Sequence, residues 1–456
     1  MRQTSFALAV LVAAILAGCG GSKDRDRDPI PKFNAQVSFG DSLSDVGTYA
    51  VGGVKALGGG KYTVNDVAAN GTNAAKNWTE IMAATIGLPA PCAAETGLLS
   101  NGTLASFAAA ISFAPTCTSY AQGGARVTEA IGPANIAYID KHNSSQLGQL
   151  TVPVATQISN HLAKVGGKLK GDEIVFVLAG GNDLLFQANQ LELDATAAGA
   201  DKYANTLIGT LAAGSSTPTA AMSVIQSAFE KELANPGHTT ATLTVAATTA
   251  AVGQGFPLVD VPAAVASATV AAETAGAAYA ANPEKLAIYV AAMARAGDQL
   301  ATLVNTQIVA NGANHVTVLN LPDASKTPYA LAQSGKAQDW ISAMVIGFNL
   351  RLAAGLAGQS KVLLVDAYTF DRDQANNPGS YGFSNVTAPA CADVDSDNPL
   401  YPPKNVLHSA LVCNKNNLIA GVTQNYKFAD TVHPTPFTNQ LLAQYVSKKM
   451  VEKGWL

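Results

Sequence analysis

The stretch AQVSFGDSLSDVG, residues 35–47, decides the fold that we predict from the sequence. Its first five residues read as a β-strand, which ends at Gly40. Three further short runs are rich in Val, Ile and Leu, and long connections separate them along the chain. Such runs are typical of a parallel sheet that helices cover, so we expect an α/β fold. The three runs are residues 174–178, 315–321 and 361–365.

The region between residues 184 and 299 interrupts this alternation of strands and helices. It is rich in Ala and Thr, and its windows at 222–233 and 283–304 have a helical pattern. It is much longer than an ordinary connection between two strands. We therefore expect a helical insertion at about residues 185–300. The insertion is either a lid over the functional site or a structural subdomain, and the sequence leaves both open.

The composition indicates a large folded core and argues against nucleic-acid binding. The 456 residues are 48% hydrophobic and 13% charged, which also argues against disorder along most of the chain. Lys and Arg total 28 against 32 Asp and Glu, the formal net charge is −4, and no block of basic residues occurs. A nucleic-acid-binding protein is expected to carry a basic patch.

The N-terminus is a targeting segment. The apolar run at residues 6–16 is typical of a signal peptide and is too short for a permanent membrane span. Residues 16–19, LAGC, resemble the lipobox of bacterial lipoproteins. The resemblance implies a signal peptide at 1–18, an acylated Cys19, and a tether at 19–31 that anchors the exported domain, residues 32–456, to the cell envelope. The glycine after the cysteine favours the outer membrane of a Gram-negative bacterium. An ordinary signal peptide with an incidental cysteine is the alternative.

Four cysteines remain after Cys19, and an even number in an exported chain indicates two disulfides. Three connectivities are possible. We predict the pairing between sequence neighbours. Without a Cys-x-x-Cys spacing, a zinc site is not expected. The predicted pairs are Cys92–Cys117 and Cys391–Cys413.

Ser42 follows directly on the first predicted strand, at the edge where parallel sheets bind their ligands. If a helix begins there, its free N–H groups can stabilise an anion beside the serine. The tripeptide Gly-Asp-Ser is by itself more often a turn or a helix N-cap.

A second motif lies near the other end of the chain. In FADTVHP, residues 428–434, Asp430 precedes His433 by three positions. This spacing lets the carboxylate accept the Nδ1 proton and direct Nε2 towards a nucleophile. Because a proline follows the histidine, we expect His433 on a loop before a helix that begins at about Pro436.

Two interior segments offer hydrogen-bond donors. The turn SYAQGGAR, residues 119–126, lets the backbone approach a substrate closely at Gly123 and Gly124. Asn182, in AGGND at residues 179–183, follows the second strand and supplies a side-chain amide at the same edge of the sheet. Such donors can stabilise an oxyanion, although each segment alone also reads as a turn.

Together, and in this order, the four segments closely resemble the SGNH hydrolases, the GDSL esterase and lipase family. The resemblance covers most of the chain from about residue 37 to residue 446 apart from the insertion, and residues 312–323 also resemble the lipase-like branch. It implies a flavodoxin-like three-layer α/β/α sandwich with a five-stranded parallel sheet. The chain lacks a Gly-x-Ser-x-Gly motif, which disfavours the α/β-hydrolase fold. Ser119 departs from the asparagine of many members, at a position without a chemical role.

The family roles carry over residue by residue. Ser42 resembles the nucleophile, and its own N–H is one oxyanion donor. Gly124 resembles the glycine whose N–H is another donor, with the preceding glycine as the competing assignment. Asn182 resembles the asparagine that donates through its side chain. His433 resembles the general base and acid, and Asp430 the residue that orients it.

The resemblance implies a serine hydrolase that cleaves carboxylic esters through an acyl-enzyme on Ser42, without a cofactor. A lipid acyltransferase and a carbohydrate acetyl-esterase share the same site and stay open as alternatives. From another class, a surface lipoprotein that binds lipid or glycan on an inactive scaffold is the rival. We expect an ester or lipid substrate and a monomer.

Three other features receive a structural interpretation. Residues 393–398 begin like a calcium loop, but Asn398 and Lys404 stand where such a loop needs glycine and glutamate, so we expect a solvated acidic loop. The histidines lack metal-ligand spacing, and no metal site is expected. Asp45 and Asp183 flank the functional residues, and we expect them to shape their loops by hydrogen bonding.

Overall fold

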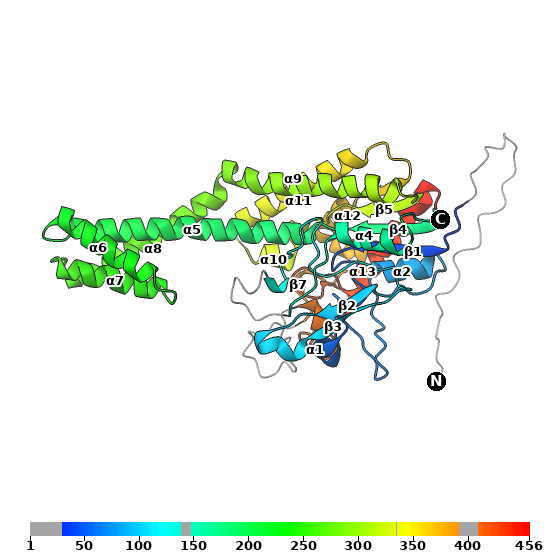
Figure 1. Cartoon of the computed structure of the whole chain (residues 1–456), viewed down its shortest axis with the longest axis horizontal. Coiled ribbons are helices and arrows are strands. Elements are labelled where there is room, and N and C mark those ends of the chain that lie inside the picture. Colours follow the sequence, from blue (N-terminus) through cyan, green and yellow to red (C-terminus); the bar gives the residue numbers. More distant parts are fainter. Residues whose placement is uncertain (1–29, 138–146, 334, 392–408) are drawn as a thin grey trace.

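The computed structural model describes residues 30–137, 147–333, 335–391 and 409–456. Its centre is a parallel sheet with the strand order β1-β4-β5-β6 (Figure 1). All four strands lie where the sequence predicts them, although the third ends at Leu319 rather than at residue 321. The chain is therefore an α/β protein. The strands are β1 (Ala35–Gly40), β4 (Glu173–Leu178), β5 (His315–Leu319) and β6 (Val362–Val365).

The main sheet has four regular strands within the described ranges, so the expectation of five is not confirmed. A further segment nevertheless runs along the free side of β1. Ser38 forms an isolated parallel bridge with Ser119. The N–H groups of Tyr120 and Gln122 donate to the carbonyls of Ser38 and Gly40. Residues 118–122 thus extend the hydrogen bonding of the sheet without forming a regular strand.

Helices cover both faces of the sheet, because successive side chains of a strand point to opposite faces. Val175 and Val177 of β4 belong to the core that α4, α9 and α11 cover, whereas Phe176 and Leu178 pack in the core beneath α2 and α13. Every residue of β4 is buried, as expected for an interior strand of a parallel sheet. The covering helices are α2 (Trp78–Thr85), α4 (Val154–Lys164), α9 (Pro283–Leu303), α11 (Gly335–Leu356) and α13 (Pro436–Lys453).

The region predicted to be a helical insertion forms a long arm (Figure 1). Helix α5 (Gly181–Ala213) starts directly after β4 and runs far out from the sheet. Helices α6 (Pro218–Leu233), α7 (Thr240–Gly253) and α8 (Val261–Ala281) pack around its outer part with a core of their own. By length and composition alone, residues Leu258–Ala281 would suffice to cross a membrane; here this helix packs along α5.

Two disulfides lie among the smaller elements of the chain. Cys92 bonds to Cys117 and Cys391 to Cys413, with Cα atoms 5.1 and 5.8 Å apart, which is the predicted pairing. The remaining elements are α1 (Gly52–Ala56), β2 (Glu95–Leu98), η1 (Gly102–Phe107), β3 (Ala109–Phe113), η2 (Leu258–Asp260), η3 (Val304–Val309), η4 (Ala324–Lys326), α10 (Pro328–Leu331), α12 (Ala367–Asn376), η5 (Pro378–Tyr381), β7 (Asn385–Pro389), η6 (Ala410–Val412) and β8 (Tyr426–Phe428).

Two predictions fall outside the described residues. The signal peptide, the acylated Cys19 and nearly all of the tether lie within residues 1–29. The acidic loop that begins like a calcium site lies within residues 392–408.

Candidate active site

Ser42 lies in a tight turn just beyond β1, and a glycine makes this position possible. Gly40 has φ of 153°, and a Cβ atom there would meet the Leu178 carbonyl oxygen at 2.1 Å. Gln157 of α4 holds Gly40 from the other side, accepting from its N–H at 2.9 Å and donating to its carbonyl at 2.8 Å. No helix begins at Ser42, so the free N–H groups of a helix N-terminus are not available beside this serine. The turn closes through the Asp45 N–H, which donates to the Ser42 carbonyl.

The loop that carries Asp430 and His433, near the C-terminus, packs against the turn that carries Ser42. His433 Nε2 lies 2.9 Å from Ser42 Oγ, and His433 Nδ1 lies 2.7 Å from Asp430 Oδ2. Because the ionised carboxylate can only accept, the proton belongs on Nδ1, which leaves Nε2 free to accept the proton of the serine hydroxyl. The residues predicted as nucleophile, base and orienting acid thus form one continuous hydrogen-bonded relay across 391 positions of sequence.

Hydrogen-bond donors of the backbone and the imidazole of His433 keep Asp430 ionised. Its side chain is largely buried, and burial alone would raise its pKa, but the charge and hydrogen bond of His433 and the N–H groups of Val432 and Ala410 lower it to about 2. The backbone N–H of His433 donates to Oδ1 at 2.7 Å, and that of Ala410 donates to Oδ2 at 2.6 Å. Asp430 therefore carries its charge throughout the neutral range, and its geometry is fixed.

The histidine loop ends as the sequence predicts. Thr435 caps α13 by accepting from the Thr438 N–H, and Pro436 is the first helical residue. The Tyr62 ring, whose centroid lies 4.7 Å from that of the imidazole, packs against His433. Sequence reasoning missed Tyr62 and the Ala410 N–H, because neither stands in a recognisable motif.

The candidate oxyanion donors lie beside the relay. Asn182, in the first turn of α5, is buried and donates from Nδ2 to the Ala125 carbonyl at 2.9 Å, which joins it to the glycine turn. The Gly123 N–H is engaged, because it donates to Asp45 Oδ2 at 3.0 Å. Among the described residues, no acceptor is found for the N–H of Gly124 or of Ser42. This difference favours Gly124 over Gly123 as a donor to a substrate.

Replacing Asn182 by alanine is expected to lower kcat roughly 100- to 1,000-fold, because one donor to the developing oxyanion is lost. Steady-state kinetics with 4-nitrophenyl butyrate, below the unfolding temperature, measure the effect. A fall in kcat of less than about threefold would rule out this role for Asn182.

Asp45 and Asp183 shape their loops, as predicted. Asp45 accepts from the Gly47 and Thr48 N–H groups at 2.8 Å, besides Gly123. Asp183 accepts from Arg126 Nε at 3.0 Å and from the Val127 N–H at 2.9 Å. Both carboxylates thereby attach the glycine turn to the segments that carry Ser42 and Asn182.

A third aspartate, Asp41, is buried next to the nucleophile. Burial raises its pKa to about 7, although the Leu43 N–H, which donates to Oδ1 at 3.0 Å, and nearby His433 act in the opposite direction. The folded chain therefore keeps a proton on Asp41 at pH values where the unfolded chain has lost it.

This shift predicts a pH-dependent stability. Between the ordinary pKa of 3.8 and the folded value of about 7, the unfolded state binds fewer protons, so the free energy of unfolding falls as the pH rises. Asp41→Asn removes this contribution. Between pH 4 and pH 7, the free energy of unfolding of the variant should therefore rise by roughly 2–4 kcal/mol relative to that of the wild type. Urea unfolding at pH 4, 5.5 and 7 tests it, and an unchanged difference across that range would contradict it.

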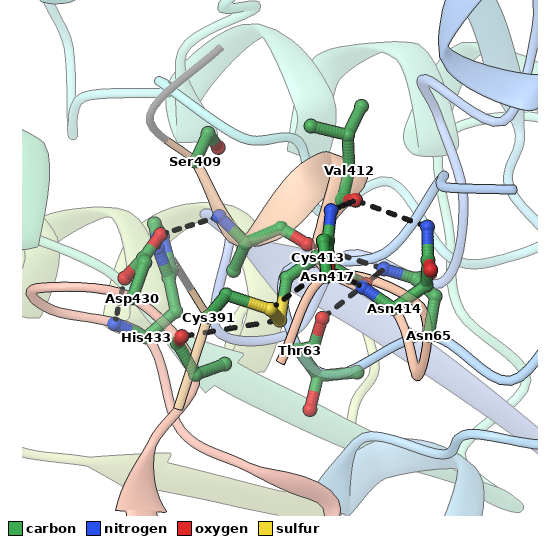
Figure 2. The surroundings of a disulfide bond; sticks show 12 residues. Thr63, Asn65, Cys391, Ser409, Val412, Cys413, Asn414, Asn417, Asp430 and His433 are labelled. Atoms are coloured by element: carbon green, nitrogen blue, oxygen red, sulfur yellow. Dashed lines mark hydrogen bonds and ion pairs between the residues drawn. A yellow bond between two sulfur atoms is a disulfide. The ribbon is translucent and has the colours of Figure 1, made fainter. Parts of the chain in front are cut away.

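One disulfide supports the acid of the relay (Figure 2). Cys391 and Cys413 are buried together with Ala410 and Ala429, the neighbours through which Asp430 is held. The Cys391 N–H donates to the Ala429 carbonyl at 2.9 Å. The bond thus fastens the segment that carries the Ala410 N–H to the loop that carries Asp430.

Changing both Cys391 and Cys413 to serine should cost roughly 3 kcal/mol of stability from loop entropy and should also lower kcat, because Asp430 loses its fixed donor. The matched control, with serine at Cys92 and Cys117, opens a loop of similar length (separation 25 against 22) away from Asp430. Thermal unfolding and kcat are measured at a temperature where both variants are folded. Equal losses of kcat would contradict the assigned role.

Ser42, Asn182 and His433 line one cavity at the carboxyl edge of the sheet. Four residues of α5 line it: Gly181, Asn182, Leu184 and Leu185. Within the described ranges, α6, α7 and α8 contribute no lining residue. This arrangement therefore does not favour a lid formed by these three helices. Described His, Cys, Asp and Glu side chains form no cluster that could hold a metal ion.

No family model and no curated protein matches this chain.

Proposed function

We propose that this protein is a serine hydrolase of the SGNH type that cleaves carboxylic esters. The observation that carries the proposal is the relay itself: Ser42 Oγ, His433 Nε2 and Asp430 are linked by hydrogen bonds of 2.9 and 2.7 Å. Beside it lie a buried side-chain amide and two backbone N–H groups for which the described residues offer no acceptor. Serine needs an adjacent base to act as a nucleophile, and the base needs a third group to orient it.

The chemistry follows from these positions. As Ser42 Oγ attacks the ester carbonyl carbon, its proton passes to His433 Nε2, and Asp430 stabilises the imidazolium. The N–H groups of Ser42 and Gly124 and the amide of Asn182 stabilise the oxyanion. His433 then protonates the departing alcohol. Water attacks the acyl-enzyme, gives its proton to His433, and the acid leaves as Ser42 regains the proton.

We propose the flavodoxin-like sandwich as the complete fold. The support is the segment at 118–122, which hydrogen-bonds to β1 on the side away from β4. Counted as a strand, it makes a sheet of five in the sequential order 2-1-3-4-5, which is the flavodoxin-like order.

We further propose that the protein is exported and anchored to the cell envelope through Cys19, as a monomer that meets its ester or lipid substrate there. The lipobox-like sequence supports the anchor. Two disulfides support export, because such bonds persist in oxidising compartments.

A fluorophosphonate probe tests the proposed function. It should label the wild-type protein on Ser42, as located by peptide mass, and should leave Ser42→Ala unlabelled. Hydrolysis of 4-nitrophenyl esters should be lost in parallel. An unlabelled, inactive wild-type protein would favour the rival binding lipoprotein. Product analysis with and without a lipid alcohol separates hydrolysis from acyl transfer, and release of acetate from acetylated polysaccharide identifies an acetyl-esterase.

A further inference from the structure

An aromatic ring packs against the imidazole of the relay. The centroid of the Tyr62 ring lies 4.7 Å from that of the His433 ring, and the two ring planes are inclined by 37°. The hydrogen bonds that join the imidazole nitrogens to Asp430 and Ser42 are directed in the plane of the imidazole, so they do little to restrain its tilt. Tyr62 supplies a contact outside that plane.

The segment that carries Tyr62 is fastened to the segments around the relay. Thr63 Oγ1 donates to the Pro434 carbonyl, next to the histidine, at 2.8 Å. The buried Asn65 donates from Nδ2 to the carbonyls of Thr63 and Ala410, both at 3.1 Å. The Tyr62 ring is therefore held in place by the same parts of the chain that hold the histidine and its aspartate.

The hydroxyl of Tyr62 is not the part that acts on the histidine. It is buried, and the described residues offer it no hydrogen-bond partner. It lies against Gly123, where a Cβ atom would come within 2.0 Å of it. Burial raises the pKa of Tyr62 well above its usual range, so the side chain stays uncharged. His433 is thus in contact with a neutral aromatic ring.

A neutral ring in this position stabilises a positive charge on the imidazole. An aromatic ring attracts a cation within about 6 Å of its centroid, and more strongly where water is excluded. In the proposed reaction, the imidazole becomes a cation when it takes the proton of Ser42. The His433 side chain is 13% exposed and Tyr62 is 6% exposed, so water screens little of the attraction. Asp430 and Asp41 are the carboxyl groups whose charges also act on this imidazole.

From this arrangement we infer that Tyr62 is a positioning residue for the base: its ring keeps His433 Nε2 directed at Ser42 and stabilises the imidazolium that forms during acyl transfer. This inference rests on the proposed function. Because the ring and not the hydroxyl is responsible, phenylalanine should be able to replace Tyr62. Leucine, which is apolar but not aromatic, should not.

Steady-state kinetics of the full chain with 4-nitrophenyl butyrate test the inference. Tyr62→Phe should keep kcat within about threefold of wild type, because no hydrogen bond is lost. Tyr62→Leu should lower kcat about 10- to 30-fold. It should change KM less than about twofold, because Tyr62 does not line the cavity. Equal losses of kcat in the two variants, or an effect on KM alone, would overturn the inference.

Tyr203→Leu is the matched control for these kinetics. Tyr203 is also buried, but it lies in the separate core of the arm. The substitution removes a ring of the same size and should leave kcat and KM unchanged. All variants are measured at a temperature at which each of them is folded.

The protonation of His433 provides a readout that a merely structural role of Tyr62 would not move. NMR follows the imidazole signals of ring-labelled histidine against pH, and His433→Gln identifies the signal by its loss. Every protein carries Asp41→Asn, because Asp41 has a pKa of about 7, whereas Asp430, with a pKa of about 2, stays ionised. Since the ring favours the protonated imidazole, Tyr62→Leu should lower the midpoint by about 1–1.5 pH units, and Tyr62→Phe by less than about 0.3.

This titration does not depend on catalysis, so it separates the inference from the proposed function. If the wild type hydrolyses no ester and takes up no fluorophosphonate, but the midpoint falls in Tyr62→Leu, the function fails and the interaction of Tyr62 with protonated His433 stands. If esters are hydrolysed and the midpoint is the same with and without the ring, the function stands and the inference fails.

Discussion

Replacing Ser42 by alanine is expected to lower kcat by about 10⁶-fold, and His433→Ala should cost about as much. Ser42 Oγ and His433 Nε2 lie 2.9 Å apart and act as one unit, because neither the proton transfer nor the attack proceeds without the other. The double variant should therefore be no slower than either single variant. Steady-state kinetics with a chromogenic short-chain ester measure all three.

Ser44→Ala is the matched control for Ser42. This serine lies two positions further on, is buried, and accepts a hydrogen bond from Trp78 Nε1 at 3.2 Å. Its loss removes a structural contact and should leave kcat within a few-fold of wild type. If Ser42→Ala kept more than about one hundredth of the activity, or if the two single effects multiplied in the double variant, Ser42 would not be the nucleophile.

Asp430→Asn is expected to lower kcat by about 10⁴-fold. An amide nitrogen in place of Oδ2 would donate to His433 Nδ1, which drives the imidazole proton to Nε2. The ring could then no longer accept the proton of Ser42. The same nitrogen would face the Ala410 N–H, so some stability is lost as well.

The measurement is kcat at neutral pH, below the unfolding temperature of the variant. Asp194→Asn is the control, because Asp194 accepts from the Tyr289 hydroxyl on the arm and takes no part in the relay. Normal turnover by Asp430→Asn would mean that another group orients His433.

The strands and the residues of the site follow from local sequence. Short apolar runs have a strong β preference whatever lies beyond them, so β1, β4, β5 and β6 could be predicted within a few residues. Ser42, Asn182 and the motif with Asp430 and His433 each follow a strand or precede a helix. Parallel strands bring such positions to one edge, which is why separate motifs could be assigned to one site.

Local patterns did not predict how the site is supported. The Ala410 N–H on Asp430, the Tyr62 ring against His433 and the Asp45 carboxylate on the Gly123 N–H all depend on tertiary packing. The last of these contacts decides between two adjacent glycines that look alike in the sequence. For the same reason, the arm could be predicted to be helical, but not to extend away from the cavity.

The sequence by itself thus determined the strands and the candidate residues that meet at the site, because strand preference and side-chain chemistry are properties of a few neighbouring residues. Tertiary structure alone decided which of the two glycine N–H groups is engaged by Asp45 and how Asp430 is held ionised. These depend on contacts between segments that are distant in the chain and come together when the sheet and its helices pack.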